Sequence, residues 1–73
     1  MLALERSLEE RVDFVISNNP YLTGRKLRFE TESGRVVLKG VVNSYFQKQM
    51  AQEAVRRVDG VEEIDNCLEV AWL

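Results

Sequence analysis

Apolar residues recur at helical spacing in a first stretch of the chain, about residues 3–18. Charged residues occupy most of the positions between them, which is typical of an amphipathic helix. The apolar side of this helix is formed by Leu4, Leu8, Val12, Val15 and Ile16. Ser7 and Glu10 have the spacing of a capping box, so we expect the first turn to be frayed. Pro20 ends the helix, because it disfavours helical geometry at Asn19.

A second amphipathic stretch covers about residues 44–58. Its apolar stripe consists of Phe46, Met50, Ala51, Ala54, Val55 and Val58. Ser44 and Gln47 fit a capping box at its start. Asp59 and Gly60 indicate its stop, with Gly60 in the left-handed conformation that commonly ends a helix.

Three other stretches alternate between apolar and polar residues, which is the period of a β-strand. The expected strands are residues 26–32, 35–42 and 62–72. Ser33 and Gly34 form a turn, so the first two strands make a hairpin. The side chains expected to face the core are Leu27, Phe29 and Thr31 in the first strand, Val36, Leu38, Gly40 and Val42 in the second, and Ile64, Asn66, Leu68, Val70 and Trp72 in the third.

The order helix, strand, strand, helix, strand predicts an α+β fold, αββαβ, with residues 1–73 as a single domain. The second strand is apolar on both faces, so we place it at the centre of the sheet. The second helix is long enough to return the chain across the sheet, so the third strand should run parallel to the second. Pairing with the first strand is the alternative. We therefore expect a three-stranded mixed sheet with two helices packed on one face.

The composition is that of a folded domain, with 45% hydrophobic and 30% charged residues and a net charge of −2. This balance argues against nucleic-acid binding, which requires a surplus of Lys and Arg to displace counterions from phosphates. The N-terminus has no apolar run long enough for a signal peptide. No stretch approaches the ~20 apolar residues that a membrane-spanning helix requires.

Residue types that carry catalytic chemistry are scarce. The chain has no histidine, and Cys67 is its only cysteine, so the commonest general base and a Cys/His zinc site are both missing. The acid pairs Glu9–Glu10 and Glu62–Glu63 diverge on a helix or strand and cannot share a substrate. We expect no enzyme activity, no metal and no cofactor. Cys67 is expected to be a small, semi-buried residue on the open sheet face, with a redox or metal role as the alternative.

Several short motifs follow one another in a fixed order between Leu8 and Val70. They are Asn19-Pro20-Tyr21-Leu22, Leu27-x-Phe29, Gly34-x-Val36-x-Leu38-x-Gly40-x-Val42, Ser44, Ala51, and Gly60-Val61-x-x-Ile64-x-Asn66. Together they resemble the BON domain, a family found in bacterial osmotic-shock, secretion and channel proteins. The resemblance gives structural signature roles to Gly34, Val36, Leu38, Gly40, Val42, Ala51, Gly60, Val61 and Asn66.

This resemblance implies the same αββαβ fold and a non-catalytic module. It implies association with phospholipid membranes, in particular anionic headgroups, or with cell-envelope proteins. It also implies a location in the periplasm or cell envelope, as part of a larger bacterial protein.

Two signature residues lie unexpectedly in the core-facing series. Glycine weakens a strand unless something needs the space, so at Gly40 we expect a bulge or the close approach of a helix backbone, with a ligand in the same gap as the alternative. Asn66 is expected to bond the backbone near the Asp59–Gly60 turn or the neighbouring strand, because a buried unpaired amide is costly.

The sheet face opposite the helices is expected to be open, and basic residues gather in two places in the sequence. The candidate contacts for lipid headgroups or an envelope partner are Arg25, Lys26, Arg28, Val37, Lys39, Val41, Arg56 and Arg57. A solvated surface is the alternative for the basic residues. So few basic residues in a net-acidic domain give weak attachment, which calls for avidity or a second anchor. The rival function is protein–protein assembly through the open face or an edge strand, and the oligomeric state stays open.

Overall fold

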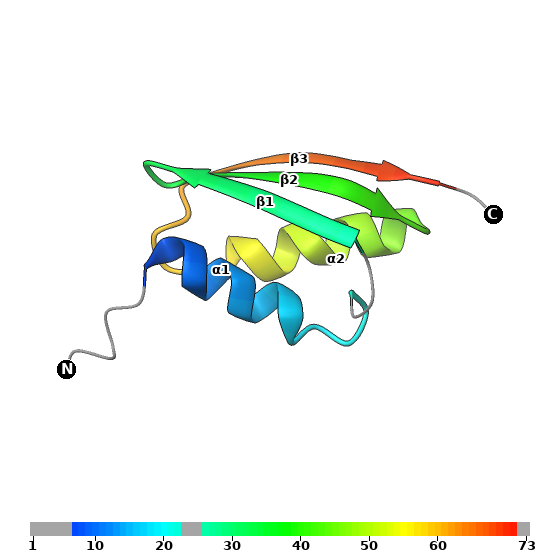
Figure 1. Ribbon diagram of the computed structural model, residues 1–73, viewed down its shortest axis with the longest axis horizontal. Helices are drawn as coiled ribbons and strands as arrows, with labels where there is room; N and C mark the ends of the chain where they lie inside the picture. Colours follow the sequence, from blue (N-terminus) through cyan, green and yellow to red (C-terminus); the bar gives the residue numbers. More distant parts are fainter. Residues whose placement is uncertain (1–6, 23–25, 72–73) are drawn as a thin grey trace.

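The computed structural model describes residues 7–22 and 26–71, except for the side chain of Lys26. The predicted α+β order is confirmed: two helices lie side by side beneath a three-stranded mixed sheet (Figure 1). Neither helix in the described part of the chain is long and apolar enough to cross a membrane. The elements are α1 (Leu8–Ser17), β1 (Lys26–Glu32), β2 (Arg35–Val42), α2 (Tyr45–Arg56) and β3 (Glu63–Val70).

The Val-rich strand β2 is the central strand, as its two apolar faces predict. It pairs antiparallel with β1, with Leu27 opposite Gly40, and parallel with β3, with Val36 opposite Ile64. The third strand therefore pairs with β2, and the alternative pairing with β1 is wrong. Because the β2–β3 pair is parallel, α2 must carry the chain back along the whole length of the sheet.

The helix α1 begins later than its apolar period predicts. Ser7 is extended, with ψ 160°, and it closes a complete capping box with Glu10: each backbone N–H donates to the other side chain at 3.1 Å. This cap fixes Leu8 as the first helical residue, in place of the predicted start near residue 3. Leu4, which the prediction counted on the apolar side, is outside the described residues.

The helix α2 begins after Ser44 as predicted, but its capping box is not closed. The Ser44 hydroxyl accepts from the Gln47 N–H at 3.2 Å, whereas the Gln47 side chain accepts from Asn43 N–H at 2.7 Å and donates to the Tyr21 carbonyl at 3.2 Å. The helix ends at Arg56, earlier than predicted. Gly60 has the expected positive φ of 99°, but it lies in the turn after the helix.

The core lies between the sheet and the two helices, where the predicted apolar stripes meet. Its buried side chains are Val12, Leu22, Val36, Leu38, Val42, Ala51, Val55, Val58 and Leu68. Phe46 is a wrong prediction: 53% of the residue is exposed, and its ring meets the edge of the Tyr21 ring at a centroid distance of 5.0 Å. Trp72, predicted to face the core, lies outside the described residues.

The two signature glycines of the hairpin both have a positive φ, which favours glycine. Gly34, with φ 87°, forms the turn as predicted, and its carbonyl accepts from Glu62 N–H at 2.7 Å. Gly40 has φ 128°, a conformation that side-chain-bearing residues rarely adopt. The predicted bulge at Gly40 is wrong, because the β1–β2 register runs through it without an extra residue. The strand needs a glycine at position 40 because this residue has a positive φ while the pairing of β1 with β2 continues through it.

We expect Gly40→Val to lower the free energy of unfolding by about 1–3 kcal/mol, because the substitution forces a β-branched residue into a positive φ. Urea unfolding followed by circular dichroism measures this change. Gly40→Ala should cost less, and the neighbouring Lys39→Ala, on the exposed face, should cost little. Equal stability of Gly40→Val and the unaltered protein would contradict the backbone explanation.

Candidate functional site

The sheet face turned away from the helices is open, and the strand register arranges its side chains in cross-strand rows. Acidic side chains outnumber basic ones over the described part of this face. An anionic surface would therefore be repelled by the face as a whole. Three of these rows are Arg28–Lys39–Cys67, Glu30–Val37–Asp65 and Glu32–Arg35–Glu63.

One row concentrates the positive charge. Arg28 lies directly opposite Lys39, and like charges at this cross-strand distance repel each other. Lys39 is partly balanced by Glu30 at 3.5 Å, but no ion pair or hydrogen bond to a described residue holds Arg28. Val41, the next open-face residue of β2, is 45% exposed, and Val37 is half-buried. The predicted contacts Arg28, Lys39 and Val41 thus share the half of the face near the end of β2.

In the opposite half of the open face, the basic residue is paired within the molecule. Arg35 forms an ion pair with Asp65 in the neighbouring strand. The hydrogen bond to Asp65 and then its charge raise the pKa of Arg35 above its ordinary value, so this guanidinium stays charged throughout the physiological range. Both side chains are open to solvent, so the pair contributes little to stability. This half offers no free positive charge to a ligand.

The second basic cluster of the sequence does not join the first. Arg56 ends α2 and pairs with Glu53 at 3.4 Å, and Arg57 is the C-cap. The direction of α2 puts both at the end of the molecule where β2 and β3 begin, away from Arg28 and Lys39 (Figure 1). Arg25 lies outside the described residues, as does the side chain of Lys26. The structure therefore separates the predicted contacts into two sites.

Three exposed aromatic residues, which the sequence analysis missed, lie at the start of α2 or pack against it. Tyr45 is 66% exposed and Tyr21 is 54% exposed, and Phe46 packs against Tyr21. The Gln47 side chain holds Tyr21 at the start of α2 by bonding both the Tyr21 carbonyl and the Asn43 N–H. The signal was present in the sequence: adjacent aromatic residues directly after an N-cap cannot both point into the core. We call Tyr21, Tyr45 and Phe46 the aromatic cluster.

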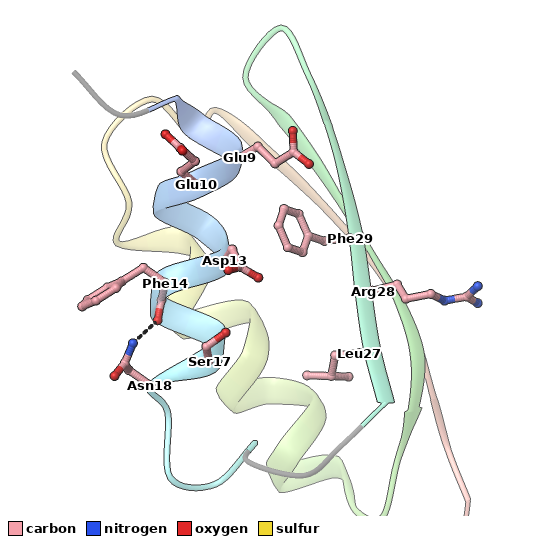
Figure 2. Close-up of a pocket in the computed structure, with 9 residues that line it drawn as sticks. All are labelled: Glu9, Glu10, Asp13, Phe14, Ser17, Asn18, Leu27, Arg28 and Phe29. Atoms are coloured by element: carbon pink, nitrogen blue, oxygen red, sulfur yellow. Dashed lines mark hydrogen bonds between the residues drawn. The ribbon is translucent and has the colours of Figure 1, made fainter. Parts of the chain in front are cut away.

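An open groove of about 740 Å³ runs between α1 and β1 (Figure 2). Leu27 and Phe29 project from β1 into it and form an apolar floor, and both are only half-buried. Glu9 and Asp13 of α1 point toward β1 and form its opposite wall. Arg28, which also borders the groove, points away from it to the open face of the sheet.

Comparison with known protein families agrees with this architecture. The family model described as the BON domain matches residues 5–71. This chain belongs to the BON domain family. No curated protein matches the chain significantly. The family is of the binding type, is not catalytic, and is associated with phospholipid and envelope binding.

The BON domain brings no metal-binding cluster together within the described residues. No group of carboxylate or thiol side chains there is arranged to hold a metal ion. Cys67 lies on the open face as expected, but it is exposed and not semi-buried. Its neighbour across the ladder is Lys39.

The signature residue Asn66 of the BON domain links the sheet to the helix layer. Its Nδ2 donates to the Lys48 carbonyl at 2.9 Å and to the Gln52 side chain at 3.1 Å, and its Oδ1 accepts from Leu68 N–H at 3.3 Å. The predicted bond to the backbone near the Asp59–Gly60 turn or to the neighbouring strand is therefore wrong. The amide instead fastens β3 to the middle of α2, and this contact lies beyond the reach of sequence spacing.

We expect Asn66→Ala to lower the free energy of unfolding by about 1–3 kcal/mol, because it removes the partly buried hydrogen bonds from β3 to the Lys48 carbonyl and the Gln52 side chain. Chemical denaturation measures this loss. Gln52→Ala is the matched control: it removes one of the same hydrogen bonds and keeps the bond to the Lys48 carbonyl, so it should cost clearly less. Equal losses in the two variants would show that the Lys48 bond is unimportant.

Proposed function

We propose that this BON domain is a non-catalytic binding module that attaches a larger bacterial protein to an anionic phospholipid surface of the cell envelope. The observation that carries the proposal is the position of the aromatic cluster. It lies where β2 stops and α2 begins (Figure 1), and Arg28, Lys39 and Val41 lie in the half of the open sheet face toward that end. We name this end the binding end. The periplasm or cell envelope is the proposed location.

The aromatic cluster suits the boundary between water and lipid. Tyrosine has an apolar ring and a polar hydroxyl, and such side chains favour the headgroup level of a bilayer. Insertion of a ring into this layer removes apolar surface from water, worth about 25 cal/mol for each Å². Tyr45, Phe46 and Tyr21 are exposed in the domain itself, so no refolding is needed to present them.

The charges at the binding end complement an anionic surface. Arg28 and Lys39 lie on its sheet side, and Lys48 lies in the first turn of α2. Two acids of the open face accompany these bases: Glu69, opposite Val41, and Glu30, which lies 3.5 Å from Lys39. A basic side chain near an anionic membrane contributes about 1 kcal/mol. So few charges give weak attachment, which a multidomain parent protein would strengthen through avidity.

This proposal divides the sequence-predicted contacts. Arg28, Lys39 and Val41 belong to the binding end, and Lys26 opens β1 there. Val37 lies nearer the start of β2, and Arg56 and Arg57 lie at the other end of α2. The last two are proposed to be solvated surface residues, which makes them suitable controls.

The domain should co-sediment with phosphatidylglycerol vesicles at low salt and only weakly with phosphatidylcholine vesicles. Arg28→Ala/Lys39→Ala should weaken this binding by about thirtyfold, because two basic contacts of about 1 kcal/mol each are lost. Arg56→Ala/Arg57→Ala removes the same charge at the opposite end and should change the binding little. Equal effects of the two double variants would disprove a specific binding end.

The aromatic part of the proposal has its own test. Tyr45→Ser/Phe46→Ser should weaken binding to the same vesicles at low and at high salt, because the loss is apolar and is not screened by ions. Circular dichroism checks that the variant is folded. Unchanged vesicle binding of the folded variant would remove the aromatic cluster from the proposal.

A further inference from the structure

The groove between α1 and β1 meets the binding end only at Arg28, whose side chain points away from it, and combines three features. The first is a free strand edge: β1 is the outer strand of the sheet, and no described residue pairs with its outer side. An unpaired edge offers backbone N–H and C=O groups to an added strand. Such an added strand would lie directly over the groove, next to Leu27 and Phe29.

The second feature is the apolar floor. Leu27 and Phe29 belong to the core-facing series of β1, yet both stay half-buried because α1 does not close over them. Alternate side chains of an added strand would point the same way and pack against this floor. The floor thus supplies a contact for apolar residues at every second position of a partner.

The third feature is the charge of the helix wall. Glu9 and Asp13 stand four residues apart on α1, both directed at the groove (Figure 2). Like charges at this spacing destabilise a helix. Neither carboxylate has an ion-pair partner among the described residues. The wall therefore keeps two uncompensated carboxylates above an apolar floor.

The spacing of the two carboxylates specifies the partner further. Residues i and i+4 of a helix are about 6 Å apart along its axis. Residues i and i+2 of a strand, which share one face, are about 7 Å apart. A Lys-x-Lys or Arg-x-Arg pair on an added strand therefore matches Glu9 and Asp13. We propose that the groove binds an extended basic segment of a partner protein, which adds a strand to β1.

A second copy of this chain fits the groove less well. Two β1 strands paired antiparallel about Phe29 would place Arg28 of each copy opposite Glu30 of the other, which is favourable. The same arrangement would bring Glu9 and Asp13 of both copies into one groove, where four carboxylates repel each other. A basic partner would reduce the repulsion between the Glu9 and Asp13 carboxylates, whereas a second copy would increase it.

NMR titration of the 15N-labelled protein with the capped peptide TVTKTKT tests the proposal. In an added strand, its valine and two lysines share one face. We expect shifts confined to β1 and the groove side of α1, with slowed exchange of β1 amides. The capped peptide TVTETET should bind about tenfold more weakly or not at all, because its charges are reversed. Shifts located on the open sheet face would overturn the proposal.

Variants of the protein separate the groove from general attraction between opposite charges. Glu9→Gln/Asp13→Asn should weaken binding of TVTKTKT by about tenfold. Glu63→Gln/Glu69→Gln makes the same change in net charge on β3, at the far edge, and should leave binding within about twofold. Equal weakening in both variants would overturn the proposal. So would failure to bind TVTKTKT, or a dimer through β1 in analytical ultracentrifugation without peptide.

Discussion

The parallel pairing of β2 with β3 is the constraint on which the rest of the molecule depends. A parallel pair cannot be joined by a tight turn, so the chain returns along α2, antiparallel to both strands. The start of α2 must then lie where β2 ends, and the end of α2 must lie where β3 begins. One end of the molecule consequently carries the first residues of α2, and the opposite end carries its last residue, Arg56, and its C-cap, Arg57. Asn66 fastens this crossover by bonding the middle of α2.

Short-range patterns were sufficient to predict the elements and their inner faces. Alternation with a period of two identifies the core-facing residues of each strand, because a strand has only two faces. The apolar residues on both faces of β2 identify it as the central strand. Patterns failed where the outcome depends on a contact distant in sequence. The side-chain amide of Gln47 bonds the Asn43 N–H and the Tyr21 carbonyl in place of the Ser44 N–H. Phe46 packs on Tyr21 outside the core.

In the candidate site, too, the sequence predicts which residues are basic, but only the fold decides which of them lie together. Arg28 and Lys39 were selected as basic residues, but the strand register is what puts them opposite each other. Arg56 and Arg57 were selected by the same criterion, and the direction of α2 removes them to the other end. The chain as a whole is weakly acidic. Its fold nevertheless places basic and aromatic side chains toward the end where β2 stops and α2 begins. The proposed function rests on this distribution of side chains over the surface, since so small a domain has a thin core.

The bond between the Gly34 carbonyl and the N–H groups of Glu62 and Glu63 has a consequence for how the chain tolerates insertions and deletions. A hairpin turn on the surface is normally a place where residues are easily added. Here the turn also receives the strand that follows α2, so an added residue would displace the anchor from which β3 takes its register. A shift by one residue would turn every β3 side chain to the opposite face. Length variation among proteins with this architecture should therefore avoid residues 33–34, although that turn is the shortest link between two of its strands.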